Sequence, residues 1–242
     1  MAEHDSLQDK VVLVTGGGSG LGAEICLTLA QAGMRVAVAD LRLPSAQDTV
    51  RRIESAGGTS WAVELDVGSA EDVQAGLADT VARHGRLDAV VNNAGVDVTA
   101  PIGELSVQDW ERVLRTNLTG PFLMAKLACQ HLPQGGHIVN IASTAARRAW
   151  PNASVYHASK WGLMGLSQAL HSELRGAGIK VSAVIAGGMR TPFLLSRFPD
   201  IDEGCLQDPA NVARAVKFVL QQPDETVVPE IMVLPMRETS WP

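Results

Sequence analysis

Short apolar runs alternate with longer amphipathic segments along nearly the whole chain. The short runs are rich in Val, Ile and Ala and predict buried β-strands at residues 10–15, 34–39, 60–65, 88–92, 137–142, 180–185 and 227–234. The longer segments carry helical patterning and predict helices at residues 23–32, 45–56, 69–84, 106–132, 154–174 and 209–221. Strands joined by helices of this length favour an α/β fold, with a doubly wound parallel sheet covered by helices on both faces.

The first predicted strand runs directly into a glycine-rich turn and then into a helix. Glycines let the backbone turn tightly and approach a pyrophosphate, and the N-terminus of the helix offers free N–H groups and the positive end of its dipole. A glycine cluster alone is also compatible with an ordinary loop, but the strand–turn–helix context favours a dinucleotide. The residues expected to form this cradle are Gly16, Gly18, Ser19, Gly20, Leu21 and Gly22.

An acidic residue ends the second predicted strand. Asp40 lies eighteen residues after Gly22 (40 − 22), close to the spacing of a carboxylate that hydrogen-bonds the ribose hydroxyls of a dinucleotide. With Leu41 beside it, Asp40 is expected to contact the adenosine end of the cofactor, and its charge would repel a 2′-phosphate. Ser19 leaves the glycine turn without a cation for that phosphate, so the sequence favours NAD over NADP. Arg42 keeps the alternative open, because its guanidinium could pair with a phosphate or could be a solvated loop charge.

Polar and small residues follow the predicted strands, at the edge where parallel sheets bind ligands. Each of them could be turn chemistry, since Asn, Asp and Gly are common loop residues. Their convergence on one edge favours a ligand cleft there. The residues concerned are Asp40, Asp66, Asn92, Asn93, Ala94, Gly95, Ser143, Ala186, Gly187 and Gly188.

The segment 154–174 begins with a Tyr and a Lys four residues apart. On a helix, Tyr156 and Lys160 project from the same face. A phenol has a pKa of about 10, and a cation within about 4 to 6 Å would lower that pKa toward neutrality. The phenol could then donate and accept protons at working pH. A pair at this spacing also arises by chance, but Tyr156 is the only tyrosine of the chain and Ser143 lies thirteen residues earlier (156 − 143).

The composition excludes several classes of function. A net charge of −6 and 46% hydrophobic residues indicate a globular protein without the basic surface that nucleic-acid binding needs. No apolar run reaches the length of a membrane span, about 18 residues, and the N-terminus lacks an export signal, so we expect a cytoplasmic protein. Cys26, Cys129 and Cys205 do not predict disulfides, and Cys129, His131 and His137 are too loosely spaced to predict a metal site. No linker or change of composition divides the chain, so residues 1–242 are expected to form a single domain.

The order and spacing of these motifs resemble those of the short-chain dehydrogenase/reductase family over about residues 8 to 235. The matching motifs are Thr15-Gly16-(three residues)-Gly20-Leu21-Gly22, Asp66-Val67, Asn92-Asn93-Ala94-Gly95, Asn117, Ser143 and Tyr156-(three residues)-Lys160. The resemblance implies a Rossmann-type sheet of seven strands and hydride exchange between a nicotinamide cofactor and an alcohol or carbonyl. It also implies a homo-oligomer, a dimer or tetramer, because long apolar helices such as 154–174 commonly form the subunit contacts of the family.

The resemblance assigns a role to each residue of the catalytic set. Tyr156 would act as the acid or base, and Ser143 would hold and polarise the substrate oxygen, on which negative charge grows as a carbonyl becomes an alkoxide. Lys160 would bind the nicotinamide ribose and lower the pKa of the tyrosine, and Asn117 would anchor a water-mediated proton relay. The residues that would contact the adenine or line the cofactor cleft are Asp66, Val67, Asn92, Asn93, Ala94 and Gly95.

The chain departs from the family after its sixth predicted strand. The family usually has Pro-Gly there, whereas this chain reads Ala186-Gly187-Gly188-Met189-Arg190-Thr191. Because a proline would have fixed φ, we expect a looser loop against the nicotinamide. Gly187, Met189 and Thr191 are still expected to contact the cofactor, with Thr191 at the carboxamide or a phosphate.

The substrate pocket is expected between the catalytic serine and tyrosine, where Trp150 joins them as a substrate contact. Arg147 and Arg148 in the same loop could bind an anionic substrate or could be solvated charges. Residues 192–207 include several apolar side chains and are expected to cover the site as a short mobile lid, which favours a hydrophobic substrate.

We therefore predict an NAD-dependent oxidoreductase that acts on a secondary alcohol or its ketone. The same fold and catalytic set would serve an NADP-dependent reductase of 3-oxoacyl thioesters, such as those carried by acyl carrier protein. A dinucleotide-binding regulator without turnover is a second alternative, although no proton-transfer group is missing from this chain. No nucleic-acid, membrane or metal partner is expected.

Overall fold

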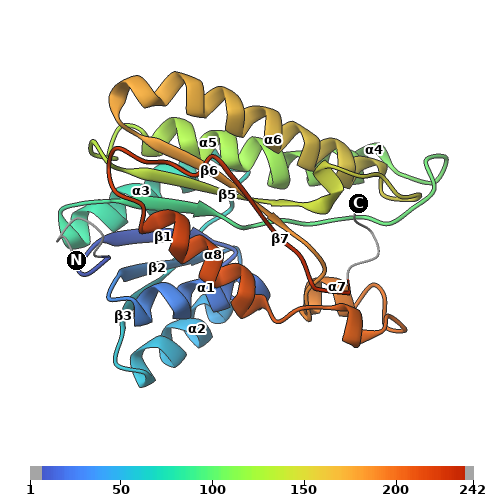
Figure 1. Cartoon of the computed structure of the whole chain (residues 1–242), viewed down its shortest axis with the longest axis horizontal. Helices are drawn as coiled ribbons and strands as arrows, with labels where there is room; N and C mark the ends of the chain where they lie inside the picture. Colours follow the sequence, from blue (N-terminus) through green and yellow to red (C-terminus); the bar gives the residue numbers. More distant parts are fainter. Residues whose placement is uncertain (1–6, 238–242) are drawn as a thin grey trace.

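A computed structural model describes residues 7–237 of the chain (Figure 1). Its centre is a seven-stranded sheet in the order β3-β2-β1-β4-β5-β6-β7, and every neighbouring pair of strands is parallel. The strands are β1 (Val11–Thr15), β2 (Arg35–Asp40), β3 (Thr59–Glu64), β4 (Ala89–Asn92), β5 (His137–Ser143), β6 (Lys180–Ala186) and β7 (Glu230–Val233). The predicted parallel α/β sheet and the seven strands implied by the resemblance are both confirmed.

Helices cover both faces of this sheet (Figure 1). One face carries α1 (Gly20–Gln31), α2 (Leu43–Ser55) and α8 (Pro209–Leu220). The other carries α3 (Ala70–His84), α4 (Val107–Leu114), α5 (Gly120–Ala128) and α6 (Ser154–Leu174). The shorter helical segments are η2 (Arg115–Thr119), η3 (Thr144–Ala146), η4 (Arg175–Ala177), α7 (Pro192–Leu195) and η5 (Glu203–Cys205). Within residues 7–237, no helix combines the length and the apolar character that crossing a membrane requires.

Strand β1 shows why the predicted strands are continuously apolar. Val12 and Val14 belong to the apolar cluster beneath α1 and α8, whereas Val11 and Leu13 belong to the cluster beneath α3 and α5. All four side chains are 0% exposed. Each one contributes roughly 1.5–3 kcal/mol by leaving water. A strand covered by helices on both faces therefore needs apolar side chains at every position.

Local signals place the ends of most helices where the sequence predicts them. At the start of α3, the Ser69 hydroxyl accepts a hydrogen bond from the N–H of Asp72 at 3.2 Å, and α3 ends at Gly85 with φ 70°. Such an N-cap and a left-handed C-cap satisfy backbone groups that the helix leaves free.

The helix predicted over residues 106–132 differs from the structure. Its region consists of α4, the π-helical turn η2 and α5, and the last of these ends at Ala128. A single π turn inserts one residue into the helical register, and the spacing of apolar residues over a long window averages this insertion out.

The strand order creates a crevice at one edge of the sheet. From β1 the chain continues to β2 on one side, whereas β4 pairs with β1 on the other side. The loops that follow β1 and β4 therefore diverge at the C-terminal edge, which is the place where open α/β sheets bind ligands.

Candidate active site

A cavity of about 790 Å³ lies at the C-terminal edge of the sheet. This volume falls within the range of small-molecule and cofactor sites, roughly 300–1,000 Å³. The predicted site residues that line it are Gly16, Ser19, Gly20, Leu21, Gly22, Asp40, Leu41, Asp66, Val67, Asn93, Ala94, Gly95, Ser143, Trp150, Tyr156, Lys160, Gly187, Met189 and Thr191. Gly18 and Asn117 are not part of the lining and lie behind it.

The glycine turn has no room for side chains. A Cβ at Gly22 would lie 2.0 Å from the carbonyl oxygen of Gly16, and a Cβ at Gly18 would lie 2.7 Å from Oδ2 of Asp40. Gly16 has φ 64°, a backbone conformation that favours glycine. The Ser19 side chain makes no capping hydrogen bond, so the first N–H groups of α1 are available to a ligand. The turn therefore fits a pyrophosphate at a helix N-terminus.

Asp40 closes one end of this cradle. Its Oδ2 accepts a hydrogen bond from the N–H of Gly18 at 3.0 Å, and its Oδ1 accepts one from the N–H of Arg42 at 3.0 Å. Asp40, Leu41 and Arg42 all line the cavity at this end. Asp40, which favours NAD, and Arg42, which keeps the NADP alternative open, therefore lie at the same end of the cavity.

The loop after β4 is tied to the glycine turn. The Thr15 hydroxyl accepts hydrogen bonds from the N–H groups of Asn93 and Ala94, each at 3.1 Å. Asn93 Nδ2 donates to the carbonyl oxygens of Thr15 at 3.0 Å and Gly16 at 3.2 Å. These bonds hold the two walls of the crevice at a fixed separation, with Ala94 and Gly95 on its surface.

The prediction that Asn92 lines the cofactor cleft is wrong. Its side chain is 3% exposed, and Nδ2 donates to Oδ1 of Asn140 on the neighbouring strand at 2.8 Å. Asn140 in turn donates to Ser167 at 2.9 Å. Neighbouring residues of a strand point to opposite faces, so Asn92 joins this polar ladder inside the protein while Asn93 faces the turn.

Ser143, Tyr156 and Lys160 meet at the opposite end of the cavity. Ser143 is the last residue of β5, and the other two lie four residues apart on the first turns of α6. The Ser143 hydroxyl forms a hydrogen bond with the Tyr156 phenol. Lys160 Nζ lies 5.7 Å from the centre of the Tyr156 ring and donates to the carbonyl oxygen of Ile141 at 2.8 Å. The fold thus brings together the three groups that the sequence analysis singled out.

The pKa of Tyr156 differs from the expectation. Burial raises the pKa of Tyr156 to about 12, the hydrogen bond from Ser143 acts in the opposite direction, and the charge of Asp97 adds to the increase. Burial also lowers the pKa of Lys160 to about 8, and its Nζ is directed to the Ile141 carbonyl. The expectation of a lowered tyrosine pKa is therefore wrong for the protein alone, because desolvation of the phenolate is the largest cause and the ammonium of Lys160 is not among the groups that shift this pKa.

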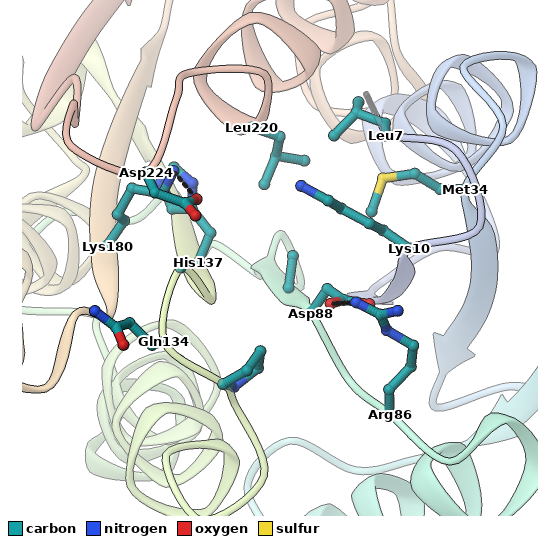
Figure 2. Close-up of a pocket in the computed structure, with 13 residues that line it drawn as sticks. Leu7, Lys10, Met34, Arg86, Asp88, Gln134, His137, Lys180, Leu220 and Asp224 are labelled. Atoms are coloured by element: carbon teal, nitrogen blue, oxygen red, sulfur yellow. Dashed lines mark hydrogen bonds and ion pairs between the residues drawn. The ribbon is translucent and has the colours of Figure 1, made fainter. Parts of the chain in front are cut away.

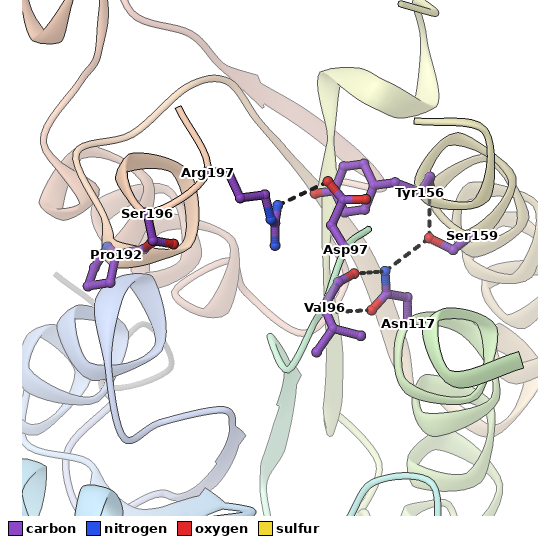
Figure 3. A network of polar contacts seen from close by, with 8 residues as sticks. All are labelled: Val96, Asp97, Asn117, Tyr156, Ser159, Pro192, Ser196 and Arg197. Atoms are coloured by element: carbon purple, nitrogen blue, oxygen red, sulfur yellow. Dashed lines mark hydrogen bonds and ion pairs between the residues drawn. The ribbon is translucent and has the colours of Figure 1, made fainter. Parts of the chain in front are cut away.

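Asn117 connects this end of the cavity to the loop after β4 (Figure 3). It lies in η2 and is 1% exposed. Nδ2 donates to the carbonyl oxygen of Val96 at 2.8 Å and to Ser159 Oγ at 3.0 Å, and Oδ1 accepts from the N–H of Val96 at 2.8 Å. Ser159 Oγ donates to the carbonyl oxygen of Tyr156 at 2.8 Å. Isolated π-helical turns occur frequently at functional sites, and here the turn places Asn117 against both segments.

Comparison with known proteins identifies the family. Residues 10–202 match the family model described as short chain dehydrogenase. This chain belongs to the short-chain dehydrogenase family. It is 38% identical over 202 residues to 3beta-hydroxysteroid dehydrogenase 1 of Eggerthella lenta. The matched stretch covers 81% of this chain and 77% of that protein. It is 40% identical over 180 residues to D-threitol dehydrogenase of Mycolicibacterium smegmatis. The matched stretch covers 74% of this chain and 69% of that protein.

The solved structures of short-chain dehydrogenases share the whole fold of this chain. A metagenomic short-chain oxidoreductase in complex with NADP superposes with a TM-score of 0.82 at 29% identity, covering 96% of this chain and 99% of that chain. The Rossmann-type fold implied by the motifs is thus confirmed over almost the full length of the sequence.

The loop after β6, in which this short-chain dehydrogenase lacks the family proline, is anchored by other means. Ala186 remains in β6 and pairs with Val233 of β7, and the N–H of Gly187 donates to the carbonyl oxygen of Val233 at 2.9 Å. Met189 forms a parallel bridge with Gln207, whose side chain also donates to the Val233 carbonyl at 3.0 Å. These contacts attach the loop to β7 and to Gln207, and the expectation of a looser loop stays a prediction.

The segment predicted as a lid covers the catalytic end with apolar side chains. It contains α7 and η5, and the Phe193 ring centre lies 6.1 Å from that of Tyr156. Thr191, just before α7, is 4% exposed, and a Cβ built at Gly20 would lie 3.5 Å from its Cβ. The segment thus bridges the glycine turn and Tyr156. Its mobility stays a prediction.

His157, the residue after Tyr156, positions Trp150. The backbone N–H of Trp150 donates to His157 Nε2 at 3.1 Å, and the two rings meet edge to face with centroids 4.5 Å apart. His157 Nδ1 lies 2.8 Å from the Ala145 carbonyl oxygen. His157 therefore has a structural role. Arg147 forms an ion pair with Glu230 and does not line the cavity, so it is not offered to a substrate.

Two charged residues that the sequence analysis missed form an ion pair in the lining of the cavity (Figure 3). Arg197 Nη1 donates to Asp97 Oδ2 at 2.9 Å. The sequence did offer one signal for Asp97, which lies only two residues after Gly95 and so directly follows the predicted cofactor cleft. Arg197 is one hundred residues away along the chain, so only the fold brings it to Asp97.

A second cavity of about 280 Å³ opens at the opposite, N-terminal edge of the sheet (Figure 2). Several of its charged side chains have partners within the chain: Arg86 pairs with Asp88 at 2.6 Å, and Lys180 Nζ donates to the Gln222 carbonyl at 2.9 Å. His137 belongs to this cavity and is remote from the candidate active site. Among residues 7–237, no group of three His, Cys, Asp or Glu side chains is arranged to hold a metal ion.

Proposed function

We propose that this short-chain dehydrogenase transfers a hydride between NAD and a secondary alcohol or the corresponding ketone. One observation carries the proposal: a single cavity has the glycine turn with Asp40 at one end and the Ser143, Tyr156 and Lys160 cluster at the other. The relatives named for a 3beta-hydroxysteroid and for D-threitol support the reaction type.

The cofactor site is supported by the shape and chemistry of the cradle. A bound nicotinamide dinucleotide would supply the hydride chemistry. Gly16 to Gly22 would hold its pyrophosphate, Asp40 would accept hydrogen bonds from the ribose hydroxyls, and Asp66 and Val67 would contact the adenine.

The chain itself has to orient the substrate oxygen and move one proton. The hydroxyls of Ser143 and Tyr156 would both point at the carbonyl oxygen, where donors stabilise the negative charge that develops. Because burial raises the pKa of Tyr156 to about 12, the phenol is protonated at neutral pH and can donate its proton to that oxygen. Oxidation of an alcohol requires the reverse transfer, so Tyr156 must first lose its own proton and then accept the proton of the alcohol as a phenolate.

Lys160 and Asn117 would support this step from behind. With a pKa of about 8, Lys160 is mainly charged at pH 7, and the Ile141 carbonyl takes one of its three N–H groups. The others are free to bind a ribose hydroxyl of the cofactor. Asn117 holds the Val96 backbone and Ser159 in place, and we propose that it also anchors the proton relay.

Initial rates with NAD(H) and NADP(H) on a panel of secondary alcohols and ketones test the proposal. We expect turnover with a clear preference for NAD(H), and we expect Tyr156→Phe to lower kcat by about 10²–10⁴-fold with cofactor affinity retained. Cofactor binding without turnover of any compound would favour the regulator, and activity unaffected by Tyr156→Phe would refute the role of the phenol.

The NADP-dependent alternative is favoured by one observation: Arg42 lines the cavity at the same end as Asp40, and its backbone N–H donates to the Asp40 carboxylate. The relative solved with NADP shows that this fold accommodates the extra phosphate. Asp40→Asn keeps the shape and removes the charge, so it is expected to reduce the ratio of NAD to NADP activity at least tenfold. A wild-type protein that prefers NADPH would overturn the choice of NAD and support reduction of 3-oxoacyl thioesters.

We also propose that the chain forms a homo-oligomer through its α4–α6 layer. Trp161 on α6 is 52% exposed and Phe122 on α5 is 43% exposed, which is unusual for large apolar side chains. Light scattering coupled to size-exclusion chromatography measures the assembly, and Trp161→Glu is expected to shift it toward the monomer. A wild-type monomer would contradict this proposal.

A further inference from the structure

The ion pair between Asp97 and Arg197 leaves one carboxylate oxygen unused. Arg197 binds Oδ2, whereas Oδ1 is shielded from solvent and has no hydrogen-bond partner among the described residues. Burial raises the pKa of Asp97, against the lowering effects of the Arg197 charge and of the N–H of Val98, and that N–H does not meet Oδ1 at hydrogen-bond geometry. Buried polar atoms in native proteins nearly always have a partner, so an orphaned acceptor on a cavity wall calls for a ligand that donates to it.

This acceptor belongs to the catalytic end of the cavity. Asp97, Ser143 and Tyr156 all line the same space. The charge of Asp97 is close enough to raise the pKa values of both Tyr156 and Lys160. Figure 3 shows the Asp97 carboxylate beside the Tyr156 ring. A molecule whose reacting oxygen binds to Ser143 and Tyr156 therefore extends past Asp97.

The position of the Asp97 carboxylate is set from two sides. The backbone of the preceding residue, Val96, is held by Asn117 through both its N–H and its carbonyl, at 2.8 Å each. On the other side, the Arg197 guanidinium stacks on the Phe193 ring at 4.1 Å from its centre while it binds Oδ2. Oδ1 is thus a preorganised acceptor, which costs little further ordering when a ligand binds.

The surroundings of Asp97 define the chemistry of that ligand. Phe193, Leu194, Phe198 and Ile201 supply apolar surface to the same end of the cavity. Arg197 is already paired with Oδ2, so a substrate carboxylate or phosphate placed at Oδ1 would meet the negative charge of Asp97. A neutral hydroxyl group satisfies Oδ1 without introducing a charge.

We propose that Asp97 is a specificity-determining residue that accepts a hydrogen bond from a second hydroxyl of the substrate. The preferred substrates are then diols, or the corresponding hydroxyketones, rather than simple alcohols. The inference rests on the proposed function, because it names the substrate class of the same reaction. A site built to bind a hydroxyl discriminates strongly against an analogue that lacks it, since the acceptor would stay buried and unpaired.

Three substrates that share one carbon skeleton test the inference with wild-type protein: 2,3-butanediol, 2-butanol and 3-methoxy-2-butanol. The methyl ether keeps the second oxygen and removes its hydrogen. We expect kcat/KM with NAD to be at least tenfold higher for the diol than for either of the others. 1,3-Butanediol, which moves the second hydroxyl by one carbon, measures how far Oδ1 lies from the reacting carbon.

Variants of the same segments separate recognition from general damage. Asp97→Leu removes the acceptor and is expected to lower the ratio of diol to 2-butanol kcat/KM at least tenfold. Asp200→Asn, an exposed carboxylate outside the cavity lining, serves as the matched control and is expected to leave the ratio at the wild-type value. Asp97→Asn, whose amide oxygen can still accept, is expected to lie between the two.

The outcomes distinguish this inference from the proposed function. Turnover of 2-butanol with no preference for the diol, or with an equal rate for the methyl ether, would overturn the role of Asp97 and leave the dehydrogenase activity standing. A ratio unchanged in a folded Asp97→Leu would do the same. Should that variant fail to fold, the ether comparison decides by itself. Absence of turnover on every alcohol and ketone would refute the proposed function.

Discussion

His137 makes the acid stability of this protein predictable. It lies at the start of β5 in the second cavity, is 2% exposed, and has Nε2 at 2.8 Å from Ser182 Oγ (Figure 2). The Ser182 hydroxyl donates its hydrogen to the Val228 carbonyl at 2.7 Å, so the ring must donate through Nε2. Nδ1 is then a buried acceptor that has no hydrogen-bond partner among residues 7–237. Burial, reinforced by the charges of Lys180 and Lys10, lowers the pKa of His137 to about 3.

A lowered histidine pKa means that stability is lost as the pH falls. Below the ordinary value of 6.5 the unfolded chain binds a proton at this ring, and the folded protein does not bind it until about pH 3. Each pH unit within that window reduces the free energy of unfolding by about 1.4 kcal/mol. Because the unfolded histidine is only half protonated at pH 6.5, acidification from pH 6.5 to pH 4.5 should remove about 2 kcal/mol through His137 alone.

Urea unfolding at a series of pH values, followed by tryptophan fluorescence, measures this loss. His137→Gln cannot titrate, and its amide nitrogen can still donate to Ser182. The variant is expected to be less stable at pH 7 and to lose about 2 kcal/mol less than wild type between pH 6.5 and pH 4.5. His131→Gln, at an exposed position, is the control and should follow wild type. Equal slopes for wild type and His137→Gln would refute the reasoning.

Three further predictions concern the candidate active site and its helix. Gly22→Ala should destabilise the protein and abolish binding of dinucleotide, because its Cβ would lie 2.0 Å from the Gly16 carbonyl oxygen; a thermal melt and a binding titration check the two effects, and an unchanged melting temperature would contradict the clash. Tyr156 is the only tyrosine, so ultraviolet difference titration of the protein alone should detect no phenolate until the pH approaches about 12, and a midpoint near 10 would contradict the role of burial. Asn117→Ala should cost about 2–3 kcal/mol in urea unfolding by leaving backbone groups of Val96 unpaired, and a loss below about 0.5 kcal/mol would contradict that role.

Most of the fold and of the candidate site that the sequence determined follows from the spacing of residues close together in the chain. The alternation of apolar strands and amphipathic helices predicts the parallel sheet, because the two periodicities depend only on neighbouring residues. The glycine turn, Asp40 and the Tyr156–Lys160 pair were found in the same way, since each depends on a short stretch of strand, turn or helix. Parallel strands share one edge, so these stretches were also expected to converge there.

The tertiary structure decided what depends on distant segments. Desolvation by surrounding elements sets the pKa of Tyr156, and no pair of residues in the sequence reports it. The loop after β6 is anchored by Val233 and Gln207, which come from other parts of the chain. Asp97 meets Arg197 across one hundred residues. Burial and long-range contacts are sums over the whole fold, whereas a motif records only which neighbours the chain itself places side by side.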